Sequence, residues 1–274
     1  TEAQGFWKEW IAEDRILLGD KKDNFWEMGE TGPCGPCTEI HYDGRSDEDR
    51  AKVSGASLVN MDHEDVIEIW NNVFMEFNRK ANGGLEKLPE QHVDTGMGFE
   101  RLVRIIQGKN SNYDTDVFQF IIEKTAKAAQ VNYGQDPKQD IALRVIADHI
   151  RAVCMCISDG QLPASNGAGY VVRRILRRAV RYGFSYLNLS EPFLHTLVED
   201  LADYFAKDFP ELQSQSDFVA NVIAQEEKSF FRTLSKGIAM LQEYFTKDST
   251  KELHGKIAFE LFDTYGFPVD LTDL

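Results

Sequence analysis

The stretch of this 274-residue sequence that decides the fold reads VDTGMGFERLVR and runs from Val93 to Arg104. Its first half alternates as a strand does, which places Gly96 and Gly98 on one face. Two glycines on one face leave bare backbone on which a flat group such as adenine can lie. A helix follows and would end at Gly108. Near the start of that helix, the guanidinium of Arg101 could bind a polyphosphate through two hydrogen bonds.

The same stretch has two other interpretations. It could be a strand–helix junction in which the glycines are needed only for close packing. It could also be a dinucleotide-binding fingerprint, but Arg101 stands where the third glycine should be and no strand-plus-acid unit follows. In the strand interpretation the other face of the strand points into a core and consists of Val93, Thr95, Met97 and Phe99.

A second alternating stretch, EIWNNVFMEFNR, runs from Glu68 to Arg79. As a strand it would place Asn71 on one face together with four apolar side chains. An amide on such a face is costly to bury unless it has a partner. Asn71 could be bonded to a neighbouring backbone group, or it could be the polar anchor of a small-substrate pocket with an apolar floor.

A third stretch contains Cys34-Gly-Pro-Cys37, a pattern that also occurs at the redox centre of thioredoxin-like proteins. A redox cysteine needs the N-terminus of a helix, which lowers the thiol pKa. The residues after Cys37, TEIHYDG, alternate and end in a hairpin-type Asp-Gly, so a strand is favoured over a helix. This disfavours a thiol–disulfide oxidoreductase. A zinc site that adds Cys154 and Cys156 is disfavoured because Cys-x-Cys is not a usual ligand spacing.

A cluster of arginines lies on a predicted helix from Val171 to Tyr182. At about 100° per residue the arginines fall within about 140° of arc and form one stripe opposite an apolar face. The Asn166-Gly-x-Gly turn before the helix exposes backbone amides, so turn and stripe together could bind phosphates. A solvated basic face paired with nearby acids is the alternative. The stripe consists of Arg173, Arg174, Arg177, Arg178 and Arg181.

Composition limits the class of protein. A net charge of −15 argues against a general nucleic-acid binder, although a local basic patch can hold phosphates whatever the total charge. No apolar run approaches the roughly eighteen residues of a membrane span, so we expect no membrane partner. Four cysteines in so long a chain do not suggest a disulfide framework, and we expect a cytoplasmic protein.

The chain changes character part-way along. Residues 24–106 combine glycine-rich turns with short alternating runs, which predicts strands of a mixed sheet. From about residue 115 a 3.6-residue period dominates. With a boundary at residues 110–112, we predict an α+β half, residues 1–110, followed by an all-helical domain, residues 111–274. We also predict a strand–turn element from Phe259 to Leu274.

These stretches resemble a known family. VDTGMGFER, residues 93–101, resembles motif 3 of the class II aminoacyl-tRNA synthetases. Together with WNNVFMEFNR, residues 70–79, and TGPCGPCTEI, residues 31–40, it is similar to the alanyl-tRNA synthetases. The resemblance covers residues 24–274. It implies the C-terminal part of an antiparallel-sheet catalytic domain, then a helical tRNA-binding domain. It also implies ATP-dependent attachment of alanine to tRNA-Ala through an alanyl-adenylate.

The resemblance implies roles for individual residues. Arg101 would be the catalytic arginine that binds the γ-phosphate of ATP, and the strand with Gly96 and Gly98 would lie under the adenine. Glu68 could hold the Mg²⁺ that accompanies ATP. Asp94 would bind the ammonium group of alanine. The rest of the alanine pocket would consist of Trp26, Asn71, Val73 and Gly96.

In the family, the helical domain cradles the tRNA acceptor stem. Asn166 and Asp263 would reach a G·U wobble pair through the wide, shallow minor groove of RNA. Arg173, Arg174, Arg177 and Arg178 would contact the tRNA. Motifs 1 and 2 and the zinc-dependent editing site have no counterpart here, so we expect no zinc and a segment that is inactive without the remainder of its parent chain. A non-catalytic tRNA-binding fragment is the alternative.

Overall fold

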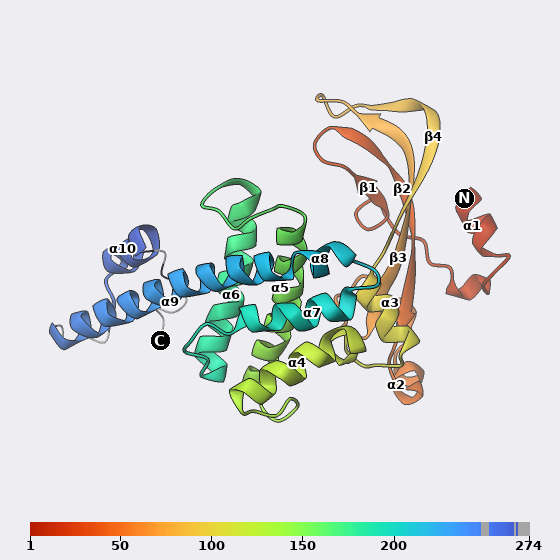
Figure 1. Cartoon of the computed structure of the whole chain (residues 1–274). Coiled ribbons are helices and arrows are strands. Elements are labelled where there is room, and N and C mark those ends of the chain that lie inside the picture. The colour runs from red at the N-terminus through yellow and green to blue at the C-terminus, as the bar shows by residue number, and fades with distance from the viewer. Residues whose placement is uncertain (248–251, 266, 268–274) are drawn as a thin grey trace. The chain divides into compact units, whose positions relative to one another are not determined.

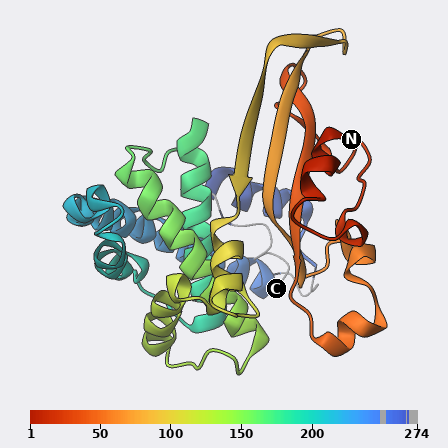
Figure 2. The ribbon, with the colours of Figure 1, turned by 90° about the vertical axis from the view of Figure 1, so that its right-hand side faces the viewer.

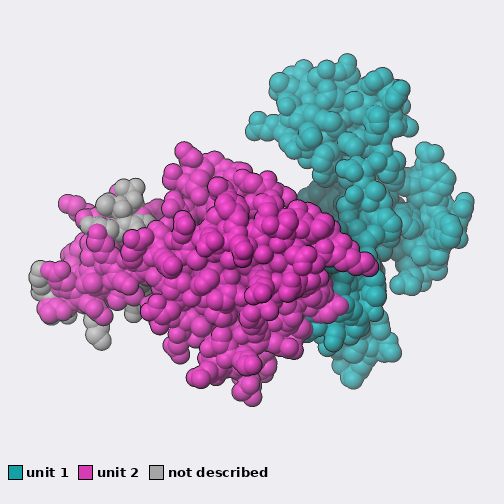
Figure 3. Space-filling view, in the orientation of Figure 1, with its two compact units in different colours: residues 1–115 teal, residues 116–274 magenta. Residues whose placement is uncertain are grey.

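The computed structural model describes residues 1–247, 252–265 and 267, except for the side chains of residues 247 and 263–265 (Figure 1). The chain divides into two compact units, Thr1–Thr115 and Asp116–Leu274 (Figure 3). The division lies shortly after residues 110–112.

Unit 1 is built on a four-stranded antiparallel sheet whose strands follow one another in chain order (Figure 2). The strands are β1 (Phe25–Glu27), β2 (Gly32–Asp43), β3 (Val66–Arg79) and β4 (Leu85–Met97). The prediction of a mixed sheet is therefore wrong. Successive strands lie side by side, and β3 and β4 are joined by a short turn in which Gly83 has a φ of 81°. A connection this short can only produce antiparallel neighbours.

Short helices complete unit 1: α1 (Glu2–Trp7), η1 (Glu13–Arg15), α2 (Asp47–Lys52), η2 (Gly55–Leu58), α3 (Phe99–Ile106) and η3 (Asn112–Asp114). The predicted strand-to-helix change after Gly98 is confirmed, because β4 ends at Met97 and Gly98 caps α3. Gly108 ends α3 as predicted. It has a φ of 61°, and the amides of Gly108 and Lys109 bond to the carbonyls of Ile105 and Arg104, which is the Schellman pattern.

The apolar face of β4 is not buried, contrary to the sequence-based expectation. Val93 and Met97 are 66% and 40% exposed, and Phe99, which begins α3 and does not extend the strand, is 52% exposed. β4 is one of the two edge strands of the sheet, and the described residues cover this face only in part. The buried positions of the sheet lie on β2 and β3 instead: Cys34, Cys37, Val66 and Val73.

Unit 2 consists of helices throughout its described part. These are α4 (Asp116–Ala129), α5 (Pro137–Ser158), α6 (Gly167–Leu187), η4 (Leu194–Leu197), α7 (Val198–Phe205), α8 (Pro210–Ser214), α9 (Ser216–Lys247) and α10 (Gly255–Tyr265). α5 and α6 pack along each other at the centre of this unit, and their facing residues are almost completely buried: Leu143, Ile146, Ile150, Val172, Leu176 and Ala179. None of the described helices is long and apolar enough to span a membrane.

Two element predictions in unit 2 need correction. α10 occupies Phe259–Tyr265, where we predicted a strand–turn element, because Ile257 and Leu261 lie one helical turn apart and Leu261 is fully buried. Residues 266 and 268–274 lie outside the described residues. α6 is longer than predicted in both directions, since Gly169 at its start and Gly183 and Leu187 at its end continue its buried face.

Candidate active site

Four of the residues predicted to bind alanine form a block on two neighbouring strands. Asn71 and Val73 of β3 pair directly with Gly96 and Asp94 of β4. Paired residues point to the same face of a sheet, so all four side-chain positions lie together. Val73 is buried, Asn71 is half-buried, and Asp94 and Gly96 are exposed. The block therefore presents an apolar floor, an amide and an accessible carboxylate.

The surroundings of Gly96 bear on why glycine stands there. A Cβ atom added at Gly96 would meet nothing within 4 Å among the described residues, whereas one at Gly98 would contact the flexible side chain of Arg101 at 3.1 Å. Close packing within the described chain therefore does not account for Gly96. The bare backbone faces open space, as a ligand-binding floor requires. Beside it, Oδ1 of Asp94 accepts a hydrogen bond from the Thr95 amide at 2.9 Å, and no described residue donates to Oδ2.

Asn71 belongs to a polar network that sequence reasoning missed. Its Nδ2 donates to Oε1 of Glu39 at 3.2 Å, and Oε2 of Glu39 lies 2.9 Å from Nε2 of His41. The partner of Asn71 is thus a side chain of β2 and not a neighbouring backbone group. Oδ1 of Asn71 is buried, and no described residue donates to it. In the sequence, the alternation of Cys37, Glu39 and His41 indicates that these residues share one face of β2. The contact between Glu39 and Asn71 follows only from the register of β2 on β3.

The cysteine pair lies in an environment unsuited to redox chemistry. Cys34 and Cys37 are 0% and 4% exposed and both lie within β2, so neither is at the start of a helix. Burial, and secondarily the charge of Glu39, raises the pKa of the Cys37 thiol, whereas a redox cysteine needs a lowered pKa. The described residues contain no cluster of three or more metal-ligating side chains.

Trp26 is not in the block itself. It lies on β1, opposite Gly35 of β2. Cys37 of β2 lies between the two places, because it pairs with Val73 of β3 and its thiol pKa is influenced by both Trp26 and Asn71. Trp26 therefore lies two strands away from Asn71, on β1, the edge strand opposite to β4.

The two residues predicted to bind ATP phosphates and Mg²⁺ are neighbours. Nη1 of Arg101 donates to the backbone carbonyl of Glu68 at 2.7 Å and lies 3.8 Å from Oε2 of the same residue. Arg101 projects from the first turn of α3 and its side chain is 48% exposed. A dinucleotide-binding unit is excluded for this stretch, because such a unit needs parallel strands and this sheet is antiparallel.

In unit 2, Asn166 occupies the N-cap of α6 without performing the usual task of a capping residue. An asparagine there normally accepts a hydrogen bond from the second or third amide of the helix. Asn166 makes no such bond, and its side chain is exposed. The turn packs closely against the chain at Gly169. A Cβ atom added to Gly169 would lie 2.4 Å from the carbonyl oxygen of Leu162. The amide of Asn166 is thus presented to solvent on a fixed turn.

The arginine stripe on α6 is divided into two parts. Arg173 donates from Nε to Oε1 of Glu226 on α9 at 2.9 Å, and Arg177 donates to the same oxygen from Nε at 2.7 Å. Glu226 is an interleaved acid that we did not identify from the sequence, because it is far away along the chain. Arg174 and Arg178 are exposed. The predicted residue Asp263 lies within α10, but its side chain is outside the described residues.

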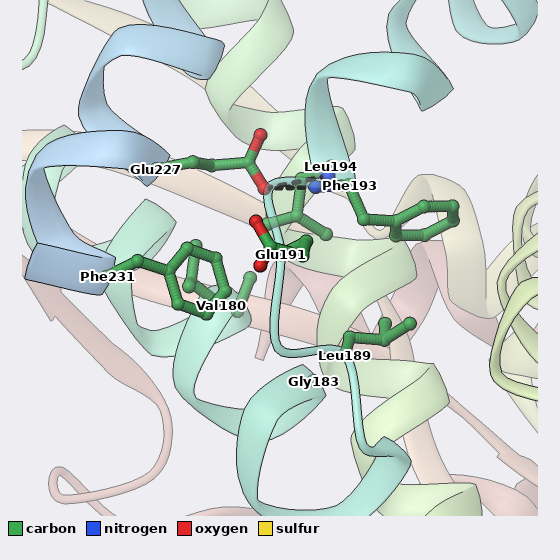
Figure 4. A pocket seen from close by; sticks show the side chains of 9 residues that line it. Val180, Gly183, Leu189, Glu191, Phe193, Leu194, Glu227 and Phe231 are labelled. Carbon is green, nitrogen blue, oxygen red and sulfur yellow. Dashed lines mark hydrogen bonds between the residues drawn. The ribbon is translucent and has the colours of Figure 1, made fainter. Parts of the chain in front are cut away.

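A small pocket between α6 and α9 is lined by a buried carboxylate (Figure 4). Glu227 is 1% exposed, and its oxygens accept hydrogen bonds from the amides of Phe193, Leu194 and His195 at 2.8–3.1 Å. The ring Nδ1 of His195 lies 2.9 Å from the same carboxylate. Glu227 caps the start of η4, so this acid has a structural role.

The whole chain, residues 1–274, matches the family described as tRNA synthetases class II (A). The chain belongs to the class II tRNA synthetases. Its similarity to individual relatives is high. It is 63% identical to an alanine–tRNA ligase of Cytophaga hutchinsonii, 58% to one of Flavobacterium psychrophilum and 56% to one of Christiangramia forsetii. Each match covers 100% of this chain, but the chain spans only 32% of each relative.

The predicted residues of this class II synthetase segment thus form three groups. One group is the four-residue block on β3 and β4, and a second is the neighbouring pair of Glu68 and Arg101. The third lies around α6 in unit 2, where Asn166, Arg174 and Arg178 are exposed.

Proposed function

We propose that this chain is the part of an alanine–tRNA ligase that holds the alanine pocket, one side of the ATP site and a surface for the acceptor stem of tRNA-Ala. The observation that carries the proposal is the block of Asn71, Val73, Asp94 and Gly96, which combines an apolar floor with an exposed carboxylate. The identity of more than half to relatives named alanine–tRNA ligase supports the choice of alanine. We place the reaction in the cytoplasm, where proteins are synthesised.

Each residue of the block has a distinct task toward alanine. The carboxylate of Asp94 binds the ammonium group as a charge-assisted hydrogen bond. Val73 lies under the methyl group, and Asn71, held by its hydrogen bond to Glu39, is the polar group beside this floor. Gly96 leaves room above the backbone. A pocket of this kind discriminates against one additional methylene by about 1–3 kcal/mol.

The ATP end of the site rests on Arg101 and Glu68. The guanidinium of Arg101 neutralises phosphate charge, and ATP would have to replace its present hydrogen bond to the Glu68 carbonyl. Mg²⁺ is usually held by one or two carboxylates together with substrate phosphates, so Glu68 fits as the protein ligand. When bound, the ion supplies further charge neutralisation. The remaining catalysis is positioning of the alanine carboxylate against the α-phosphorus.

Unit 2 contributes the contact with tRNA. The side-chain amide of Asn166 makes no capping hydrogen bond and is available to the G·U pair. Asp263 is proposed to contact the same base pair through its carboxylate. Arg174 and Arg178 contact phosphates. Arg173 and Arg177, which we expected to contact the tRNA, instead donate hydrogen bonds to Glu226. We propose that they stabilise the packing of α6 on α9.

An exchange of segments tests the alanine site. This chain replaces the matching stretch of the Cytophaga hutchinsonii ligase, which supplies the remaining two thirds of the enzyme. The chimera should catalyse alanine-dependent ATP–pyrophosphate exchange, and Asp94→Ala should abolish it, whereas Glu90→Ala, an exposed acid on the same strand, should not. Unchanged exchange in Asp94→Ala would remove the proposed role. The 274-residue chain alone should be inactive.

A non-catalytic tRNA-binding fragment is the second candidate, and the exposed Asn166, Arg174 and Arg178 around α6 favour it. Binding of the isolated chain to tRNA-Ala with and without the G·U pair tests it. A preference that Asn166→Ala removes supports specific reading of the acceptor stem. Uniform and steeply salt-dependent binding would show an unspecific basic surface. An inactive chimera whose isolated segment still binds tRNA would favour this candidate.

A further inference from the structure

Five side chains on α6 stand four residues apart and form one row, which winds by about 40° per step around the helix: Tyr170, Arg174, Arg178, Tyr182 and Tyr186. Residues with this spacing are neighbours on a helix surface, with Cβ atoms about 5–6 Å apart. Sixteen residues of helix extend over roughly 24 Å. We call this row the α6 ridge.

The α6 ridge is exposed and partly preordered. Tyr170 and Tyr186 are 46% and 41% exposed, and Arg174 and Arg178 are exposed as well. The half-buried ring of Tyr182 lies between its neighbours, with the Arg178 guanidinium 5.7 Å above it and the Tyr186 ring 5.5 Å away. Arg181 also lies over Tyr182, at 5.0 Å. Such mutual contacts reduce the conformational entropy that these side chains lose when a ligand binds.

The ridge differs from the arginine stripe that the sequence suggests. The side chains of Arg173 and Arg177 are only 29% and 22% exposed, because both turn toward Glu226. Arg178 interacts electrostatically with an acid of the neighbouring helix α5, Asp148. Hydrogen bonding to His149 lowers the pKa of Asp148, and Arg151 and Arg178 contribute to a smaller extent. The charges beside the ridge are thus mostly engaged within the protein, while the ridge itself remains accessible.

The chemistry of the ridge fits a strand of nucleic acid with unpaired bases. Two arginines one turn apart match successive phosphates, and aromatic faces stack on bases that are not paired. Bases inside a duplex cannot reach such rings. The chain as a whole has a net charge of −15, which repels a polyanion. Nucleic acid should therefore bind only where a local feature such as the ridge attracts it.

We propose that the α6 ridge binds a single-stranded segment of RNA, with Arg174 and Arg178 on its phosphates and Tyr170 and Tyr186 stacked on its unpaired bases. The proposal rests on the proposed tRNA-binding function, because the turn with Asn166 opens the same helix.

Fluorescence anisotropy with the 274-residue chain and two labelled RNA hairpins tests the ridge. The hairpins share one stem, and only one has an unpaired 3′ extension. The chain should bind the extended hairpin more tightly. Tyr170→Leu or Tyr186→Leu should weaken that binding about tenfold each and leave the blunt hairpin unaffected, whereas Tyr→Phe should preserve it. Arg174→Gln and Arg178→Gln should each reduce the salt slope by about 1.

Matched variants away from the ridge control for unspecific effects. Arg232→Gln on α9 and Tyr42→Leu on β2 remove exposed side chains of the same types and should change nothing. Far-UV circular dichroism verifies the fold of each variant. Equal affinity of the wild type for both hairpins, or Tyr→Leu variants that bind like the wild type, would overturn the ridge proposal and leave tRNA binding in place. If the wild type binds neither hairpin, both the ridge proposal and the proposed tRNA binding would be overturned.

Discussion

Replacement of Asn166 by alanine separates two functions that an N-cap asparagine can have. A capping asparagine stabilises its helix, and its loss costs about 0.5–2 kcal/mol. In α6, Asn166 makes no side-chain cap bond and is exposed. We therefore expect Asn166→Ala to lower the free energy of unfolding by less than about 0.5 kcal/mol, as for a surface position.

The effect on RNA recognition should be much larger. A side-chain contact to the edge of a base is worth about 1–3 kcal/mol of discrimination. At about 1.4 kcal/mol per factor of ten, loss of the Asn166 amide should reduce the preference for a G·U over a G·C acceptor stem by about five- to 150-fold. Stability and specificity thus change independently at this residue.

The assay needs a probe for each unit. All four tryptophans lie in unit 1, so fluorescence monitors that unit, and far-UV circular dichroism follows the helices of unit 2. Denaturant unfolding and competitive binding of the two tRNAs are measured for Asn166→Ala and for Ser165→Ala, an exposed neighbour in the same turn. A loss of more than about 1 kcal/mol in Asn166→Ala would show that the residue is a cap in solution. Unchanged discrimination would refute its role in recognition.

Three further predictions concern stability. Glu227→Gln should destabilise unit 2 by about 1–3 kcal/mol, because one oxygen that accepts buried N–H groups becomes a donor; an unchanged dichroism midpoint would contradict this. Hydrogen bonds from Arg45 lower the pKa of Asp43, so their stabilisation is present above the unfolded-state pKa of about 3.9 and is lost as the pH falls through the lower folded-state value. Asp43→Asn should therefore flatten the acid dependence of tryptophan fluorescence, and an unaltered acid transition would argue against the pair. Gly169→Ala should cost about 1–3 kcal/mol through the clash with Leu162, and wild-type stability would show that the loop yields freely.

The sequence predicts features that depend on local periodicity. Alternation along residues 69–77 and 93–97 places Asn71, Val73, Asp94 and Gly96 on corresponding faces, and the structure pairs them across β3 and β4. The change from strand to helix at Gly98 is equally local, since it depends on a glycine and the period that follows.

Features that depend on distant contacts could not be predicted in this way. The bond between Glu39 and Asn71 requires the register of β2 on β3, and the capture of Arg173 and Arg177 by Glu226 requires the packing of α9 on α6. Neither pair is close in sequence. The exposure of Val93 follows from the edge position of β4, which alternation does not reveal.

We propose above all that this chain carries the alanine pocket of an alanine–tRNA ligase. The most direct measurement is ATP–pyrophosphate exchange by the chimera with the Cytophaga hutchinsonii ligase, performed with each amino acid in turn. We predict that alanine supports exchange best, that glycine and serine support it weakly, and that larger amino acids do not support it. Exchange supported by a larger amino acid, or by none while the parent ligase is active under the same conditions, would contradict the claim.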